Sequence, residues 1–165
     1  MRLVAWAFAS GLIIFQAPTA VGGSNPRGSG PDLAIEIAQG ADACAATDDA
    51  LAAQALKASV KRNPPSGIPG QCSWRSLGTA GDALTVQIDE GGEGKYDFDH
   101  SKLPVRDLQG VGGKAFAFVS PAGFVQIGMM SAGSYVTIVL MLQNGSDRLQ
   151  RASDLAKAIA ARMGG

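Results

Sequence analysis

The chain has 165 residues, with 14 basic and 14 acidic side chains and therefore no formal net charge. The charges are scattered, and no basic stretch is interleaved with aromatic residues as in proteins that follow a phosphate backbone, so no nucleic-acid partner is indicated. The length suits one domain with a single hydrophobic core.

Residues 1–22 have the composition of a secretory signal peptide. Arg2 supplies the positive charge, residues 3–15 form an apolar run, and residues 20–22 offer a small-x-small cleavage site. The run is shorter than the about 20 residues that span a bilayer. We expect a secreted or periplasmic protein with no membrane span after cleavage; an uncleaved anchor is the alternative.

The mature chain is predicted to consist of a flexible leader, residues 23–40, and a single domain, residues 41–165. The leader begins with a polar stretch rich in glycine and serine, which buries too little surface to become ordered. Residues 32–39 alternate weakly and fit either a strand or one helical turn.

A helix is predicted at each end of the domain. The first covers residues 47–61, with Thr47 or Asp48 as the N-cap and Pro64 just beyond its end. The second begins at Asp147, which forms a capping-box pair with Gln150. Its apolar face comprises Ala152, Leu155, Ala156, Ile159 and Met163, and Gly164 ends it.

Five strands are predicted between the two helices. They cover residues 71–77, 83–88, 114–119, 124–130 and 135–142, and most of the connections carry turn residues. Residues 89–109 form a polar connection long enough to be functional or simply mobile. The fold class is therefore α+β: an antiparallel sheet of about five strands, with the N-terminal and C-terminal helices packed on one face.

The only two cysteines are Cys44, just before the first predicted helix, and Cys72, on the first predicted strand. In an exported chain two cysteines favour a disulfide, because the compartment is oxidising. A bridge would fasten the helix to the sheet; two buried free cysteines are the alternative.

A family resemblance rests on four short stretches. They are a cysteine before the first helix (Cys44), Cys72-Ser73-Trp74 on the first strand, a Gly-Val-Gly at residues 110–112, and the closing amphipathic helix. The combination resembles the small secreted or lipid-anchored domains of unknown function in actinobacterial cell envelopes, over about residues 41–163. Lipid-anchored members carry a cysteine at the cleavage site, and this chain has none there. The resemblance implies an envelope location, a disulfide and no catalysis.

Residues 89–107 gather most of the candidate ligands and acids. Asp97 and Asp99 with the lone His100 suggest a cation site, but EF-hand spacing fails after residue 101. His100 is the only imidazole base, and no nucleophile motif accompanies it. We predict no metal, no cofactor and no catalytic residue; a hydrolase using carboxylates between Asp89 and Asp107 is the alternative.

The glycine stretch matches a dinucleotide fingerprint only formally. Gly110 and Gly112 are followed by Ala115, but residues 115–119 continue as a strand, so no helix N-terminus would face a pyrophosphate. We interpret these glycines as a bend at the entrance to the sheet.

The sheet is apolar on both sides, which is the strongest functional signal. The two helices cover one face of the sheet. The apolar side chains of the other face must therefore be covered by the connection at residues 89–109, by a partner protein or by an apolar small ligand. The candidate contact residues are Trp74, Phe116, Phe118 and Tyr135, although a tryptophan beside a disulfide more often fills core space. We predict a non-enzymatic binding domain that uses the sheet face opposite the helices.

Overall fold

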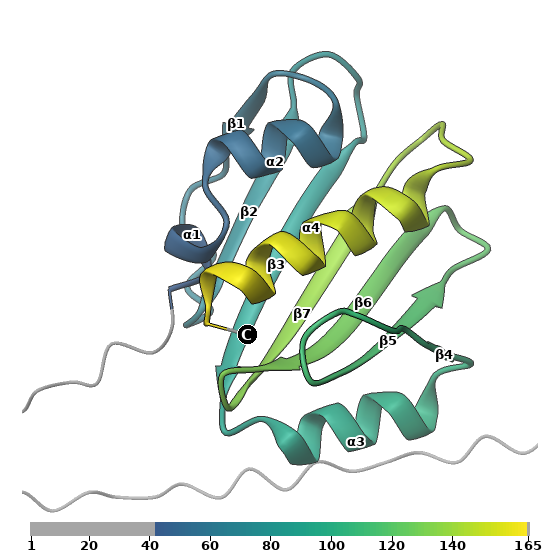
Figure 1. The fold of residues 1–165 in the computed structure, drawn as a ribbon. Coiled ribbons are helices and arrows are strands. Elements are labelled where there is room, and N and C mark those ends of the chain that lie inside the picture. Colours follow the sequence, from purple (N-terminus) through teal and green to yellow (C-terminus); the bar gives the residue numbers. More distant parts are fainter. Residues whose placement is uncertain (1–41, 165) are drawn as a thin grey trace, which may run out of the picture. The chain divides into compact units, whose positions relative to one another are not determined.

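The computed structural model describes residues 42–164; the predicted signal peptide and leader lie outside them. The described part of the chain is a mixed α+β domain (Figure 1). Its elements are α1 (Ala43–Ala46), α2 (Asp49–Leu56), β1 (Val60–Arg62), β2 (Gln71–Ser76), β3 (Ala83–Glu90), α3 (Glu93–Lys102), β4 (Arg106–Asp107), β5 (Lys114–Val119), β6 (Phe124–Ser131), β7 (Ser134–Met141) and α4 (Arg148–Arg162).

The strands form one antiparallel sheet in the order β1-β2-β3-β7-β6-β5-β4. All five predicted strands are present within one or two residues, but the predicted strand count was too low. The two additional strands, β1 and β4, are the edges of the sheet. They have three and two residues, and both carry charged side chains.

The predicted helix over residues 47–61 is wrong at its C-terminal end. α2 stops at Leu56, because Lys57 takes a left-handed backbone conformation with φ 49° that closes the helix. Val60, which lies within the predicted helix, is instead extended and pairs with Ser76 of β2. A strand of three residues is too short to show its period in the sequence.

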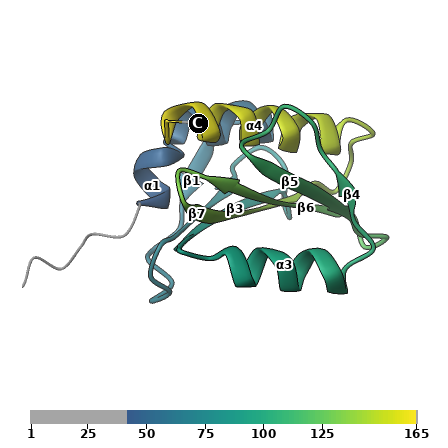
Figure 2. The same cartoon turned by 60° about the horizontal axis from the view of Figure 1, so that its bottom comes forward.

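The helices lie on both faces of the sheet. Figure 2 shows α1 and α4 above the sheet and α3 below it, and α2 lies beside α4 (Figure 1). The expectation of helices on one face only is therefore wrong. The error arises in residues 89–109, where β3 extends to Glu90 and the polar connection folds into α3 and β4.

The main core lies between the sheet and the helices α1, α2 and α4. Alternate residues of β3 point into it, and they are matched across the sheet by residues of β7 and β6. The fully buried side chains include Trp74, Leu84, Val86, Val125, Ile127, Met129, Ile138, Leu140 and Ile159.

α4 has the predicted apolar face and begins, as predicted, after Asp147 as its N-cap residue, but the predicted capping box does not form. Ala152, Leu155, Ala156 and Ile159 are buried, and Met163 packs against them. The Asp147 side chain does not cap the helix; it accepts a hydrogen bond from Lys57 Nζ, 2.6 Å away, which links α4 to the end of α2. In residues 42–164 no helix has the length and hydrophobicity needed to cross a membrane.

Candidate functional site

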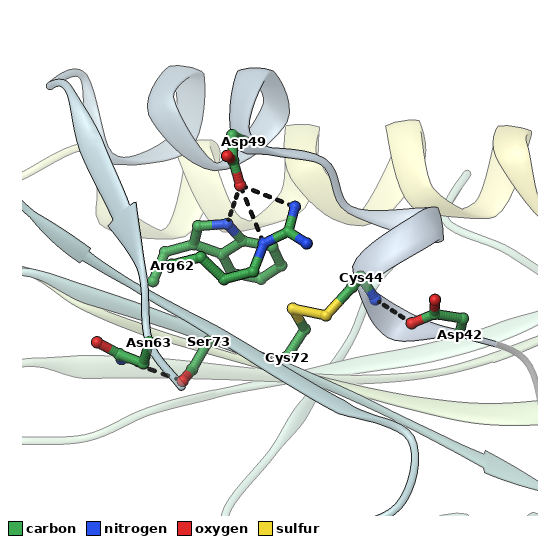
Figure 3. The surroundings of a disulfide bond; sticks show 8 residues. Asp42, Cys44, Asp49, Arg62, Asn63, Cys72 and Ser73 are labelled. Carbon is green, nitrogen blue, oxygen red and sulfur yellow. Dashed lines mark hydrogen bonds and ion pairs between the residues drawn. A yellow bond between two sulfur atoms is a disulfide. The ribbon is translucent and has the colours of Figure 1, made fainter. Parts of the chain in front are cut away.

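A disulfide joins Cys44 of α1 to Cys72 of β2, as predicted, with 5.2 Å between their Cα atoms (Figure 3). The alternative of two free cysteines is thereby excluded. Asp42 caps α1, since its Oδ1 accepts a hydrogen bond from the Cys44 amide at 2.8 Å. The bridge therefore fastens α1 to β2, the second strand of the sheet.

Trp74 lies beside the bridge, on the face that α2 covers, and its side chain is fully buried. Its indole Nε1 donates to Asp49 Oδ1 at 2.7 Å, and Arg62 Nη2 donates to the same oxygen at 2.9 Å. The Trp74 hydrogen bond, and then that of Arg62, hold the pKa of the Asp49 carboxyl below its usual value. Trp74 therefore belongs to the core and is not brought together with the other three candidate contact residues.

Phe116 and Tyr135 lie on the opposite face of the sheet, where α3 covers them. The ring of Tyr96, on α3, lies 5.3 Å from that of Phe116 and 5.8 Å from that of Tyr135, and the His100 ring lies 5.6 Å from Phe116. Both Phe116 and Tyr135 are fully buried. The polar connection at residues 89–109 thus folds over part of this apolar sheet face and covers it.

Polar contacts fasten α3 around this aromatic cluster. The least exposed is partly buried and has a carboxylate acceptor: Tyr135 Oη donates to Asp99 Oδ2 at 2.8 Å. The others are more exposed, and each contributes little alone; they join Lys95 to Asp89 at 3.2 Å, Lys114 to Glu93 at 3.0 Å and His100 to Asp107 at 2.9 Å. Most carboxylates between Asp89 and Asp107 are therefore engaged in holding α3 in place.

The suggested cation site does not form. Asp99 is directed to Tyr135, and His100 is directed to Asp107. The Ser101 hydroxyl donates to the Phe98 carbonyl oxygen within its own helix. No cluster of three or more potential metal-ligating side chains occurs among residues 42–164.

Tyr135 gives α3 a predictable pH dependence. Burial, with a further contribution from the Asp99 carboxylate, raises the pKa of the Tyr135 phenol above its ordinary value of about 10. Above pH 10 the unfolded chain loses this proton while the folded chain keeps it, so stability present below pH 10 is lost as the pH rises. Tyr135→Phe is expected to cost about 1–2 kcal/mol at pH 7 and to weaken the alkaline decline.

Urea unfolding at several pH values between neutrality and strong alkali measures both effects. Tyr96, whose pKa burial also raises, is retained in both proteins and serves as an internal control. Equal alkaline slopes for the wild type and Tyr135→Phe would contradict the assignment.

Beyond α3 the same sheet face stays partly exposed, and we call this region the open half. It consists of two cross-strand rows, Ala83-Met141-Phe124 and Thr85-Val139-Gln126-Phe118. The rings of Phe118 and Phe124 meet edge to face at 5.8 Å, and Met141 is 44% exposed. Of the four predicted contact residues, Phe118 alone lies here. Phe124 and Met141 lie on the same side of the sheet as Phe118. The sequence indicates this placement, because side chains along β6 and β7 alternate between the two faces with a period of two.

Two cations border the open half, and sequence reasoning did not find them. Lys61 of β1 and Arg75 of β2 are cross-strand partners on this side of the sheet, and both are exposed. Neither forms a salt bridge within the described residues. The predicted helix over residues 47–61 includes Lys61, so the sequence pattern does not place Lys61 beside Arg75.

The glycine stretch forms a bend, as interpreted from the sequence. Gly110 and Gly112 have φ values of 71° and 57°, and the Gly113 amide donates to the Met130 carbonyl oxygen at 3.0 Å. β5 begins at the next residue, Lys114. A Cβ at Gly112 would lie 2.6 Å from the Met130 carbonyl oxygen, so this position requires glycine for space as well as conformation.

The site is thus a sheet face divided between α3 and the open half, with a cationic border. Comparisons of the chain with models of protein families, with curated proteins and with solved structures found no match.

Proposed function

We propose that this domain is a non-enzymatic, exported binding module of the cell envelope, and that it binds a partner protein through the open half. One observation carries the proposal: α3 covers only part of an apolar sheet face, and leaves Phe118, Phe124 and Met141 at the surface. Contiguous apolar surface with a polar rim is typical of protein contact sites. The disulfide supports an oxidising compartment, and with it export.

A partner protein suits the open half better than an apolar small ligand. Small ligands bind in concave pockets of about 300–1,000 Å³ that enclose most of their surface, whereas a sheet face is an open surface. The apolar groove between α2 and α4, lined in part by Leu51, Ala55 and Leu155, holds about 160 Å³ and lies on the other side of the sheet. It is too small for a ligand of ordinary size. Larger hollows, such as one of about 660 Å³ lined in part by Lys114 and Met130, are wide open to solvent and would enclose little of a ligand's surface.

The hydrolase alternative finds less support in the contacts of residues 89–107. An acid and a base acting on one substrate must face a common space. Asp99 and Asp107 are instead bound to Tyr135 and His100, and Asp89 to Lys95. These contacts hold α3 on the sheet. Neutralising the three carboxylates is therefore expected to lower the free energy of unfolding.

Photo-crosslinking in the producing cells tests the proposal. Replacing Met141 by p-benzoylphenylalanine places the reactive group in the open half. Replacing the exposed Ala161 on α4 by the same residue places it on the opposite face as a matched control. We expect a light-dependent adduct from position 141 and none from position 161. No adduct at 141, or equal adducts at both positions, would refute the assignment of the binding face.

A further inference from the structure

α3 protrudes from the sheet face that also contains the open half (Figure 2). Tyr96 and His100 point toward the sheet, while Phe98 lies on another side of the helix and is 61% exposed. The Phe98 ring lies 5.9 Å from Lys102 Nζ of the same helix and is not part of the aromatic cluster that fastens α3 to the sheet. Nearby, Asp97 is exposed as well and forms no salt bridge within the described residues.

Residues 89–107, the segment that contains α3, differ in charge from the rest of the described residues. Residues 89–107 contain six acidic and three basic side chains, whereas the remainder of residues 42–164 contains six acidic and nine basic ones. The open half itself has no carboxylate, and Lys61 and Arg75 border it. Asp97, the acidic residue of α3 that forms no salt bridge within the described residues, is therefore opposite in charge to the two cations that border the open half.

We infer that the partner of the open half is a second copy of this chain. In a two-fold dimer the α3 helix of each protomer would lie on the open half of the other, because an isologous interface brings the same patch of both subunits together. Phe98 would then pack against Phe124 and Met141 of the other copy. This inference rests on the proposed function and names its partner.

The dimensions agree with this arrangement. α3 has ten residues and is about 15 Å long, and the open half extends over four strands, or about 15–20 Å. One helix on such a surface covers roughly a few hundred Å². In a standard interface each partner buries about 800 Å². The two-fold symmetry supplies the contact twice, which a lone helix of another protein would not do.

Sedimentation equilibrium tests the inference. The protein is purified from its producing cells and measured at concentrations from micromolar to millimolar. The wild type is expected to dimerise reversibly. Phe98→Asp and Arg75→Glu are each expected to raise the dissociation constant at least about tenfold, since each removes a central contact or reverses a charge. Lys157→Glu, the same kind of charge reversal on exposed α4, is the matched control and should leave the constant unchanged.

Phe98 and Arg75 are exposed, so both variants should keep the wild-type near-ultraviolet circular dichroism, which confirms that they fold. A wild type that stays monomeric at millimolar concentration, or a dimer that neither variant weakens, would overturn the inference. The mass of the photo-adduct at position 141 separates the two proposals. Twice the chain mass supports the second copy, whereas an adduct with a different protein alone overturns it and leaves the proposed function standing.

Discussion

Replacing Cys44 and Cys72 together by serine is expected to lower the free energy of unfolding by about 3–4 kcal/mol. The bridge closes a loop across a sequence separation of 28 residues, and its loss restores the conformational entropy of the unfolded chain. For a domain of this size the midpoint of thermal unfolding should fall by roughly 10–20 °C. Urea and thermal unfolding of both proteins, without reductant, measure the change.

Reductant provides the control for this prediction. Dithiothreitol should destabilise the wild type by a similar amount and leave the double serine variant unchanged. Hydrogen exchange should show an additional local loss at α1, whose four residues are too few to remain helical without the bridge. The central strands β3, β7 and β6 should remain the slowest to exchange, but their protection should fall with the global free energy of unfolding. A double variant as stable as the wild type would show that packing alone fastens α1 to the sheet.

Gly128→Ala is expected to destabilise the domain by about 1–3 kcal/mol through overpacking beneath α3. A Cβ at Gly128 would lie 2.4 Å from Phe116 Cζ and 2.7 Å from Tyr135 Oη. Both rings are fully buried, so neither has free space to enter. The Tyr135 hydroxyl should lose its bond to Asp99, and α3 should loosen before the main core does. Urea unfolding, with hydrogen exchange on α3, measures both changes.

Gly94→Ala is the matched control, because it makes the same chemical change within α3 itself. A Cβ at Gly94 meets no atom within 4 Å, and alanine favours a helix over glycine by up to about 1 kcal/mol. The two substitutions should therefore change stability in opposite directions. A neutral Gly128→Ala would mean that the aromatic cluster adapts more readily than its close packing suggests.

Sequence patterns predicted the parts of the fold whose periodicity is long enough to detect. The apolar face of α4 repeats over four turns, and β3, β6 and β7 each alternate or remain apolar for about eight residues. The pairing of Cys44 with Cys72 followed from their number and from the expected compartment. These features depend on local spacing and simple chemistry, which a single sequence displays.

α3 could not be predicted in the same way. The segment is polar, contains Gly94 and buries only Tyr96, so it has neither an apolar stripe nor a strong helix propensity. Its helical conformation depends on tertiary contacts with Phe116 and Tyr135, which are distant in the sequence. The apolar surplus of the sheet was predictable, but its division between α3 and the open half was not.

The short edge strands limit how this domain can associate. β1 and β4 present only three and two residues, and Lys61, Arg62, Arg106 and Asp107 place charges along them. A sheet grows into a fibre by adding strands from other molecules at its edges, and short charged edges oppose that growth. If copies of this protein meet through the sheet face instead, the assembly closes at two molecules, and a protein with much β structure can be concentrated without polymerising.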